Sequence, residues 1–259
     1  MPSHHMGHMT WQQVAEAAAR DVPVLLPCGT LEAQGLYSPM GHDYIVAERL
    51  ALAVSERTEC LVAPTLPFGY SPFLMSFSGT ISLRPETLRM LFKDMVESLL
   101  RHGFKHLIFI NNHGASEPML WHVAEETRVE HGVVLASIFP TRLAEDLSKD
   151  LFETQKGVFA HGGEPTISVM MYLCPEDMQL ENLQRISFTS PWNNFEIPGP
   201  NAIRMNGANV TVYMNFAELI PTGGTGDPAQ GSADKGKIMF DRMVDFIAAF
   251  VPEFRKVPM

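Results

Sequence analysis

The sequence lacks the features that mark several specialised classes of protein. Its 259 residues include only three cysteines, and their positions fit no disulfide framework or paired metal-binding motif. No apolar run approaches the roughly 18 residues of a membrane span, and the N-terminal residues contain no apolar signal-peptide core. We therefore expect buried free thiols at Cys28, Cys60 and Cys174, and a location in the reducing cytoplasm.

Positive charge is also scarce. The 19 Lys and Arg residues are outnumbered by 29 Asp and Glu residues, the formal net charge is −10, and the basic residues form no run or stripe. Nucleic acids and anionic membranes select basic surfaces, so neither is an expected partner. We expect a small-molecule substrate instead.

The composition that remains is that of an ordinary globular protein, with 46% hydrophobic and 19% charged residues. The length suits one large α/β domain or two small ones. We expect a flexible N-terminus over residues 1–9 and a single domain over residues 10–259.

Short apolar runs alternate with helical periodicity through the first 175 residues. Strands are predicted at residues 22–27, 60–64, 106–110 and 133–138, and helices at 43–56, 84–102, 117–130, 166–173 and 232–251. This alternation predicts right-handed βαβ crossovers, and therefore a single-domain, three-layer α/β/α fold with a largely parallel central sheet. Residues 187–230 are rich in Pro, Gly and Asn, which indicates an excursion over the site.

Polar side chains follow the ends of the predicted strands. Glu32 lies five residues after the first run, His113 lies three after the run that ends at residue 110, and Asp43 opens the next helix. Ligands of open α/β sheets bind at the carboxyl ends of strands, so we expect one shared site. Two carboxylates and an imidazole suit Zn²⁺, Mn²⁺ or Fe²⁺, and three protein ligands leave the open position of a catalytic metal. The competing role for Asp43 is a plain N-cap.

A third polar loop, residues 161–164, contributes His161 and Glu164 among glycines that let a ligand approach closely. A neutral His161 at this place suits proton transfer to a leaving group. Glu164 is predicted either to orient His161 or to complete a metal sphere.

Three further side chains are predicted to bind substrate. His42 precedes Asp43, and adjacent side chains seldom point the same way, so a substrate-facing role suits it better than metal ligation. Tyr37 follows the Glu32 segment, and Trp192 lies in the later excursion, where a core or surface role is the competing interpretation.

Five blocks of the chain, in order, resemble the creatininase family of metal-dependent amidohydrolases. The blocks are Gly-Thr-Leu-Glu-Ala-Gln-Gly at 29–35 with Pro-Met-Gly-His-Asp at 39–43, residues 68–83, Asn-Asn-His-Gly at 111–114, His-Gly-Gly-Glu at 161–164, and Thr-Gly-Asp-Pro at 225–228. The resemblance implies a creatininase-like hydrolase domain and a homo-oligomer, often a hexamer. It also implies that Glu32, Asp43 and His113 hold a metal, with Asp43 as a bridging carboxylate, and that His161 is the catalytic acid and base.

The chain departs from the family pattern around the second metal. Gln34 stands where the family has a His, Ala115 where creatininase carries a carboxylate, and Thr166 where the family has a Glu. Either the site holds one metal, or Gln34, Asp43 and Glu164 hold a weaker second ion. We predict one tight divalent metal (Zn, Mn or Fe), with Gln34 as a further candidate ligand.

The resemblance implies a hydrolase that uses metal-activated water to open a small cyclic amide. Creatinine itself is not expected, because Gly157 stands where creatininase has a Trp, four residues before the catalytic His. The first alternative is ring-opening C–C hydrolysis of a cyclic keto-sugar or keto-inositol such as 3-dehydro-scyllo-inosose. The second alternative is a family member that binds a ligand without catalysis.

Overall fold

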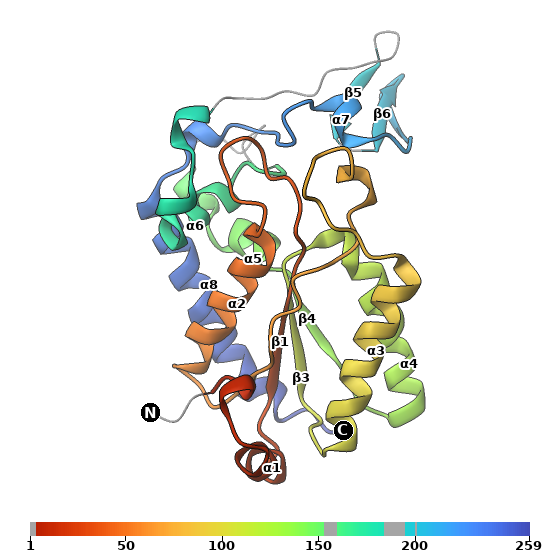
Figure 1. Ribbon diagram of the computed structural model, residues 1–259, viewed down its shortest axis with the longest axis vertical. Coiled ribbons are helices and arrows are strands. Elements are labelled where there is room, and N and C mark those ends of the chain that lie inside the picture. The colour runs from red at the N-terminus through yellow and green to blue at the C-terminus, as the bar shows by residue number, and fades with distance from the viewer. Residues whose placement is uncertain (1–3, 153–159, 184–194, 200) are drawn as a thin grey trace.

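A four-stranded parallel sheet forms the middle of the fold (Figure 1). The computed structural model describes residues 4–152, 160–183, 195–199 and 201–259. The strands are β1 (Val24–Cys28), β2 (Leu61–Val62), β3 (Leu107–Asn111) and β4 (Ala136–Ile138), in the order β2-β1-β3-β4. Every residue of β1 and β3 is buried, as the continuous apolar runs of a sheet covered on both faces require. The predicted α/β fold with a parallel sheet is confirmed.

Helices pack on both faces of the sheet. One face carries α2 (His42–Ser55), α5 (Pro140–Leu147), α6 (Thr166–Leu173) and α8 (Ala233–Phe254). The other face carries α1 (Trp11–Ala19), α3 (Pro85–Arg101) and α4 (Glu117–His131). Side chains alternate between the two cores, since Ile108 and Ile110 of β3 join the first and Leu107 and Phe109 join the second.

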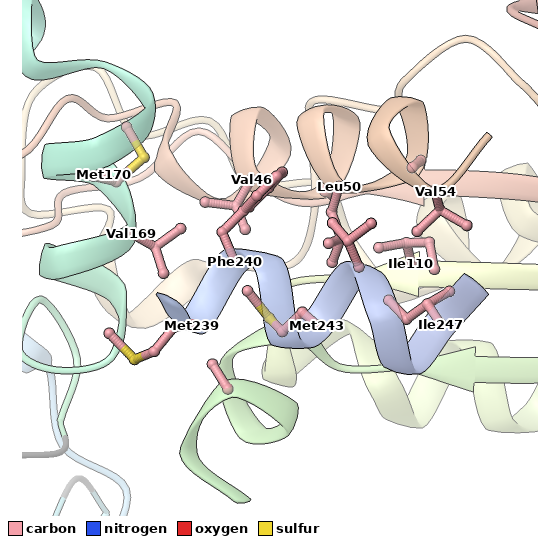
Figure 2. Close-up of a cluster of buried hydrophobic side chains, with 14 of the residues drawn as sticks. Val46, Leu50, Val54, Ile110, Val169, Met170, Met239, Phe240, Met243 and Ile247 are labelled. Carbon is pink, nitrogen blue, oxygen red and sulfur yellow. The ribbon is translucent and has the colours of Figure 1, made fainter. Parts of the chain in front are cut away.

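The larger core lies between α2 and α8. Figure 2 shows Val46, Leu50 and Val54 of α2 facing α8, with Ile110 of β3 beside them. Because the apolar residues of α2 recur at helical spacing, they form one buried stripe along the helix. The core thus fixes α2, and with it the residues at its N-terminal end, against the sheet.

Helices α6 and α8 approach each other backbone to backbone. A Cβ atom on Gly236 would lie 1.8 Å from the carbonyl oxygen of Ser168, so only glycine fits at this position. Ser232 is the N-cap of α8, and its backbone N–H donates a hydrogen bond to Ser168 Oγ over 3.0 Å. The first turn of α8 is therefore tied to α6.

The described part of the excursion forms a second, small sheet beyond the carboxyl ends of the parallel strands (Figure 1). Its antiparallel strands are β5 (Glu196–Gly199), β6 (Ala202–Met205) and β7 (Ala208–Thr211), and the short helix α7 (Phe216–Leu219) follows them. A separate apolar cluster that includes Leu74 and Phe216 joins this unit to the loops of the main sheet. The excursion thus packs above the edge where the site was predicted.

The remaining elements are short 3₁₀ helices. They lie at Met6–His8, Pro72–Leu74, Gly114–Ser116, Lys149–Leu151, Pro175–Asp177, Leu180–Asn182 and Pro228–Gln230. The first belongs to the predicted flexible N-terminus; there the backbone N–H of Val62 donates to the carbonyl of His4, while the flexibility of the segment stays a prediction. Among the described residues, no helix combines the length and the apolar character that crossing a membrane requires.

Candidate functional site

Three buried side chains converge where the parallel strands end. Glu32 comes from the loop after β1, His113 from the loop after β3, and Asp43 from the first turn of α2. One potential ligand atom from each lies within 4.8 Å of the other two. The N-cap of α2 is Gly41, and the Asp43 carboxylate contacts His113 instead of capping the helix. The arrangement is thus a three-residue group, which we call the acidic triplet.

The His113 ring faces an oxygen atom at each nitrogen. Nδ1 lies 3.0 Å from Asp43 Oδ2, and Nε2 donates to the backbone carbonyl of Tyr70 over 2.9 Å. Burial lowers the pKa of His113, but the nearby Glu32 and Asp43 carboxylates outweigh this effect and raise it to about 9. In the absence of a metal the ring is therefore protonated, and a metal ion at Nδ1 would replace that proton.

The two carboxylates of the acidic triplet are held together against their mutual repulsion. Burial raises the pKa of Glu32 and of Asp43, and His113 opposes this rise in both. Ser71 donates a hydrogen bond to Glu32 Oε2 and lies 3.1 Å from His113 Nε2. Two buried carboxylates with an imidazole fit a divalent cation, because such an ion compensates the desolvated negative charge.

Gln34 occupies the other side of the same carboxylates. Its side-chain nitrogen donates to Glu32 Oε1 over 3.2 Å and to Asp43 Oδ1 over 3.4 Å. Ala115 lines the neighbouring cavity and offers no ligand atom. A neutral amide thus bridges the two carboxylates on this side.

The acidic triplet opens into a cavity of about 410 Å³. Six of the nine site residues that the sequence predicts line this cavity: Glu32, Gln34, Asp43, His113, His161 and Glu164. Its apolar wall comes from Phe73, Phe139, Met214, Phe216 and Leu219. Among the described residues that line it there is no Lys or Arg. The volume and the mixed lining suit a small molecule without strong negative charge.

His161 stands at the edge of the acidic triplet in a fixed orientation. Its Nε2 donates to the carbonyl of Ala33 over 2.8 Å, which leaves Nδ1 3.9 Å from Glu32 Oε1. The ring of Phe216 packs edge-to-face against it, with centroids 4.9 Å apart. The nitrogen without the backbone contact therefore faces the carboxylates.

Tyr37 supports the loop that carries His161. Its hydroxyl donates to the carbonyl of Gly162 over 2.8 Å, and Gly162 has a φ of +74° that favours glycine. Tyr37 is buried and is not among the residues that line the cavity. The structure places it behind the predicted site, where it fixes the backbone.

Glu164 is buried at a separate part of the cavity wall. Ser168 donates to its Oε1 over 2.7 Å, while its Oε2 has no hydrogen-bond partner among the described residues. Burial raises the pKa of Glu164 to about 7. No hydrogen bond within the described part of the chain joins Glu164 to His161 or to the acidic triplet.

His42 is not among the residues that line the large cavity. It is buried, its Nδ1 lies 3.4 Å from Ser38 Oγ, and burial together with His161 lowers its pKa to about 3. It lines a second cavity of about 10 Å³, next to Asn112 and Thr166. Trp192, the last predicted substrate-binding residue, lies outside the described residues.

Sequence reasoning missed three side chains that the structure places at the site: Ser71, Asn112 and Phe216. Asn112 stands directly before His113, so its position at a strand end was a usable signal. Ser71 lies in the family-like block at 68–83 and Phe216 opens the short helix α7, but neither position shows a periodicity that relates it to the acidic triplet.

Comparison with known families gives a match over most of the chain. The family model described as "Creatininase: Creatinine amidohydrolase" matches residues 7–251. The chain is 35% identical to creatinine amidohydrolase of Pseudomonas putida over 114 residues, which cover 42% of this chain and 44% of that relative. It is 27% identical to the mycofactocin precursor peptide peptidase of Mycobacterium ulcerans (strain Agy99), over 86% of this chain and 81% of the relative.

A third relative is the 3-dehydro-scyllo-inosose hydrolase of Thermotoga maritima, 28% identical over 41% of this chain and 34% of the relative. Among solved structures, a creatinine amidohydrolase (creatininase) superposes with a TM-score of 0.83 at 23% identity, over the whole of both chains. Forms of creatininase titled "Zn-Zn type" and "Mn" superpose with TM-scores of 0.79 at 22% identity, over 98% or more of this chain and all of theirs. At these identities the superpositions show a shared fold.

Proposed function

The chain belongs to the creatininase family of metal-dependent hydrolases, and from that premise we propose that it hydrolyses a small cyclic amide. The observation that carries the proposal is the acidic triplet at the floor of a 410 Å³ cavity, with His161 Nδ1 facing it. Hydrolysis of a ring amide needs an activated water and a proton donor for the departing nitrogen. The residues at the cavity floor offer both.

We assign the metal to Glu32, Asp43 and His113. A divalent ion bound there would polarise the substrate carbonyl and make water a better nucleophile. The hydrogen bond from His113 Nε2 to the Tyr70 carbonyl fixes the tautomer that leaves Nδ1 for the metal. We propose one tightly bound ion, because the Gln34 amide donates to both carboxylates where a second ion would need them.

We assign the proton transfer to His161. Its Nε2–H is committed to the Ala33 carbonyl, so the nitrogen that exchanges a proton with substrate is Nδ1. In the reaction the oxygen of water adds to the amide carbon and the C–N bond breaks. The proton that the nitrogen gains comes from His161 Nδ1, which takes one in turn from the attacking water. Tyr37 keeps the His161 loop in place through Gly162.

Cleavage of a cyclic keto-inositol is the second candidate function, and the inosose hydrolase relative motivates it. Breaking a C–C bond leaves an enediolate, whose negative charge needs electrophilic stabilisation beyond the metal. The described residues of the cavity wall include no Lys or Arg for this purpose. The two relatives named as an amidohydrolase and a peptidase act on amide bonds by their names. Amide hydrolysis is therefore the function we favour.

We also propose that the protein is a cytoplasmic homo-oligomer, with a hexamer as one assembly to test. The small sheet supports self-association, because Met205, Val210 and Tyr213 on and beside it are exposed, Tyr213 at 88%. Contiguous exposed apolar residues mark interaction surfaces in soluble proteins. Light scattering coupled to size exclusion measures the assembly, and a monomer at micromolar concentration contradicts this proposal.

Metal analysis and product analysis together test the function. Protein purified without a His-affinity step is expected to retain about one equivalent of transition metal. Incubation with a panel of cyclic amides and keto-inositols, followed by mass spectrometry, is expected to add one water to an amide. Addition of water to a keto-inositol alone selects the second candidate. Less than half an equivalent of metal, together with no product from either set of compounds, would favour a family member that binds a ligand without catalysis.

A further inference from the structure

Two buried polar groups on the cavity wall have no hydrogen-bond partner within the described residues. They are Asn112 Nδ2 and Glu164 Oε2. Both side chains are almost fully buried, with exposures of 3% and 1%, and both residues line the 410 Å³ cavity. Buried polar groups are nearly always satisfied, so two free ones on one cavity wall indicate a ligand that satisfies them.

The hydrogen bonds of Asn112 determine which of its side-chain atoms is free. Its Oδ1 accepts from the backbone N–H of Thr141 over 3.0 Å and from Thr141 Oγ1 over 2.9 Å. A backbone N–H is always a donor, so the atom that meets it must be the amide oxygen. The amide nitrogen is therefore the free group, and Asn112 offers the cavity a donor.

The hydrogen bonds of Glu164 fix its chemistry in the same way. The backbone N–H of Ser232 donates to Ser168 Oγ over 3.0 Å, so the Ser168 hydroxyl proton is free to point to Glu164 Oε1, 2.7 Å away. Oε1 thus acts as an acceptor. Because the pKa of Glu164 is raised to about 7 by burial, its free Oε2 is an acceptor in the ionised form that prevails at pH 8.

The two groups belong to adjoining parts of the wall. Asn112, Pro165 and Thr166 line the small cavity of about 10 Å³ as well as the large one, so Asn112 lies near the segment that starts at Glu164. This segment is distinct from the acidic triplet, and neither free atom takes part in the proposed reaction. The wall therefore offers one donor and one acceptor away from the reacting centre.

We propose that Asn112 and Glu164 form a subsite for an H–N–C=O edge of the substrate, so that the substrate is a cyclic ureide or imide, with a second amide edge beside the one that is cleaved. This inference rests on the proposed amide hydrolysis and deepens it. The substrate N–H donates to Glu164 Oε2, and the substrate C=O accepts from Asn112 Nδ2.

Other small groups satisfy only one of the two wall residues. A carboxylate has two acceptors, which suit Asn112 but meet a like charge at Glu164. An amidine edge has two donors. Both suit the Glu164 carboxylate, but neither can accept a hydrogen bond from Asn112 Nδ2. A simple lactam has only the edge that is cleaved and leaves both wall groups buried and unpaired. Sites built to hydrogen-bond a group discriminate strongly against analogues that lack it.

Calorimetry on metal-loaded protein at pH 8 tests the subsite with two probes of equal ring size, hydantoin and 2-pyrrolidinone. Hydantoin is a cyclic ureide, whereas 2-pyrrolidinone has a single amide edge. We expect hydantoin to bind at least about tenfold more tightly. Mass spectrometry of each sample separates heats of binding from heats of turnover.

Two conservative variants isolate the wall groups. Asn112→Asp keeps an oxygen for Thr141 and replaces the free donor by a carboxyl oxygen, and Glu164→Gln keeps an oxygen for Ser168 and replaces the free acceptor by an amide nitrogen. Each variant is expected to bind hydantoin about tenfold more weakly than the unaltered protein does, whereas its affinity for 2-pyrrolidinone should fall less than about twofold. Glu253→Gln, an exposed carboxylate at the far end of α8, is the matched control and leaves both affinities unchanged.

The outcomes distinguish the subsite from the reaction on which it rests. Equal affinity of the two probes for the unaltered protein, or equal losses for both probes in the variants, overturns the subsite and leaves amide hydrolysis standing. Failure of both probes to bind or to gain water overturns the amide chemistry and the subsite with it. A selective loss of hydantoin binding in both variants, with both still folded at pH 8 by circular dichroism, supports the proposal.

Discussion

The side-chain nitrogen of Gln34 lies 3.2 Å from Glu32 Oε1, an oxygen that also lies 3.6 Å from His113 Nδ1 and 3.9 Å from His161 Nδ1. An amide nitrogen carries only a partial positive charge, so this contact stabilises the carboxylate less than a metal ion does. It nevertheless satisfies the oxygen without a second ion.

Replacing Gln34 by His is expected to create a second metal position. Imidazole is a stronger ligand for Zn²⁺ than an amide oxygen, and the change also removes the amide donor from Glu32 and Asp43. With Ala115→Glu added to supply a carboxylate, bound metal after dialysis should rise from about one equivalent towards two. Elemental analysis measures it. The exposed Gln12→His is the control, and unchanged stoichiometry in the double variant contradicts the explanation.

Asp43→Asn is expected to empty the metal site. The variant preserves shape but removes one of two charges, and the remaining Glu32 and His113 make a poor site for a divalent ion. Retained metal should fall below about a tenth of an equivalent, and activity should fall at least about a hundredfold. Asp94→Asn, on the exposed surface of α3, should change neither. Full metal retention in Asp43→Asn would show that the ligands lie elsewhere.

The pKa of Glu164 predicts a specific pH dependence of stability. Burial raises this pKa to about 7 from an ordinary value of 4.5, so the unfolded chain releases the proton first as pH rises. Stability is therefore greatest below pH 4.5 with respect to this group, falls between pH 4.5 and 7, and stays reduced above pH 7. The free energy of unfolding that this group loses over the whole range is about 3 kcal/mol, since each unit of pKa shift corresponds to about 1.4 kcal/mol.

Glu164→Gln lacks this titration, and the comparison of the two proteins measures it. The free energy of unfolding of the variant, relative to that of the unaltered protein, should rise by up to about 3 kcal/mol between pH 4.5 and 7. Urea unfolding at several pH values gives the difference. The same series with the exposed Glu253→Gln should be flat, and a flat series for Glu164→Gln would mean that the carboxyl titrates normally.

Tyr37→Phe is expected to loosen the His161 loop. The variant loses the hydrogen bond to the Gly162 carbonyl inside a buried region, which should lower the free energy of unfolding by about 1 kcal/mol or more. Because Tyr37 lies behind the cavity, kcat should fall while KM changes little. Steady-state kinetics measure this split, with the exposed Glu253→Gln as control. A rise in KM at constant kcat would instead indicate direct contact with substrate.

Much of this architecture can be predicted from the sequence, because its signals are local. The runs that became β1 and β3 are apolar throughout, and such runs flanked by turns have few alternatives to a buried parallel strand. Parallel strands also place their carboxyl ends together, so the positions of Glu32 and His113 after those ends predict their proximity.

Other features depend on packing that no local pattern encodes. Helix α5 has only eight residues and begins at Pro140, and β5 and β6 are short and partly polar, so each is too short for its pattern to be recognised from the sequence. His42 and Asp43 are neighbours in the sequence, but successive residues of a helix point about 100° apart. This geometry directs Asp43 to the acidic triplet and His42 to the small cavity.

The close contact between Gly236 and Ser168 has a consequence for how the protein tolerates sequence change. Ser168 holds Glu164, and Gly236 lies on α8, a helix that packs against α6 but is far from Ser168 in the sequence. Any side chain at residue 236 must push α8 from α6, which displaces the serine that positions the carboxylate. A saturation mutagenesis screen for loss of activity would therefore find that residue 236, in the C-terminal helix, tolerates almost no substitution. Judged by its sequence distance from the site residues alone, this position would wrongly be considered unrelated to the active site.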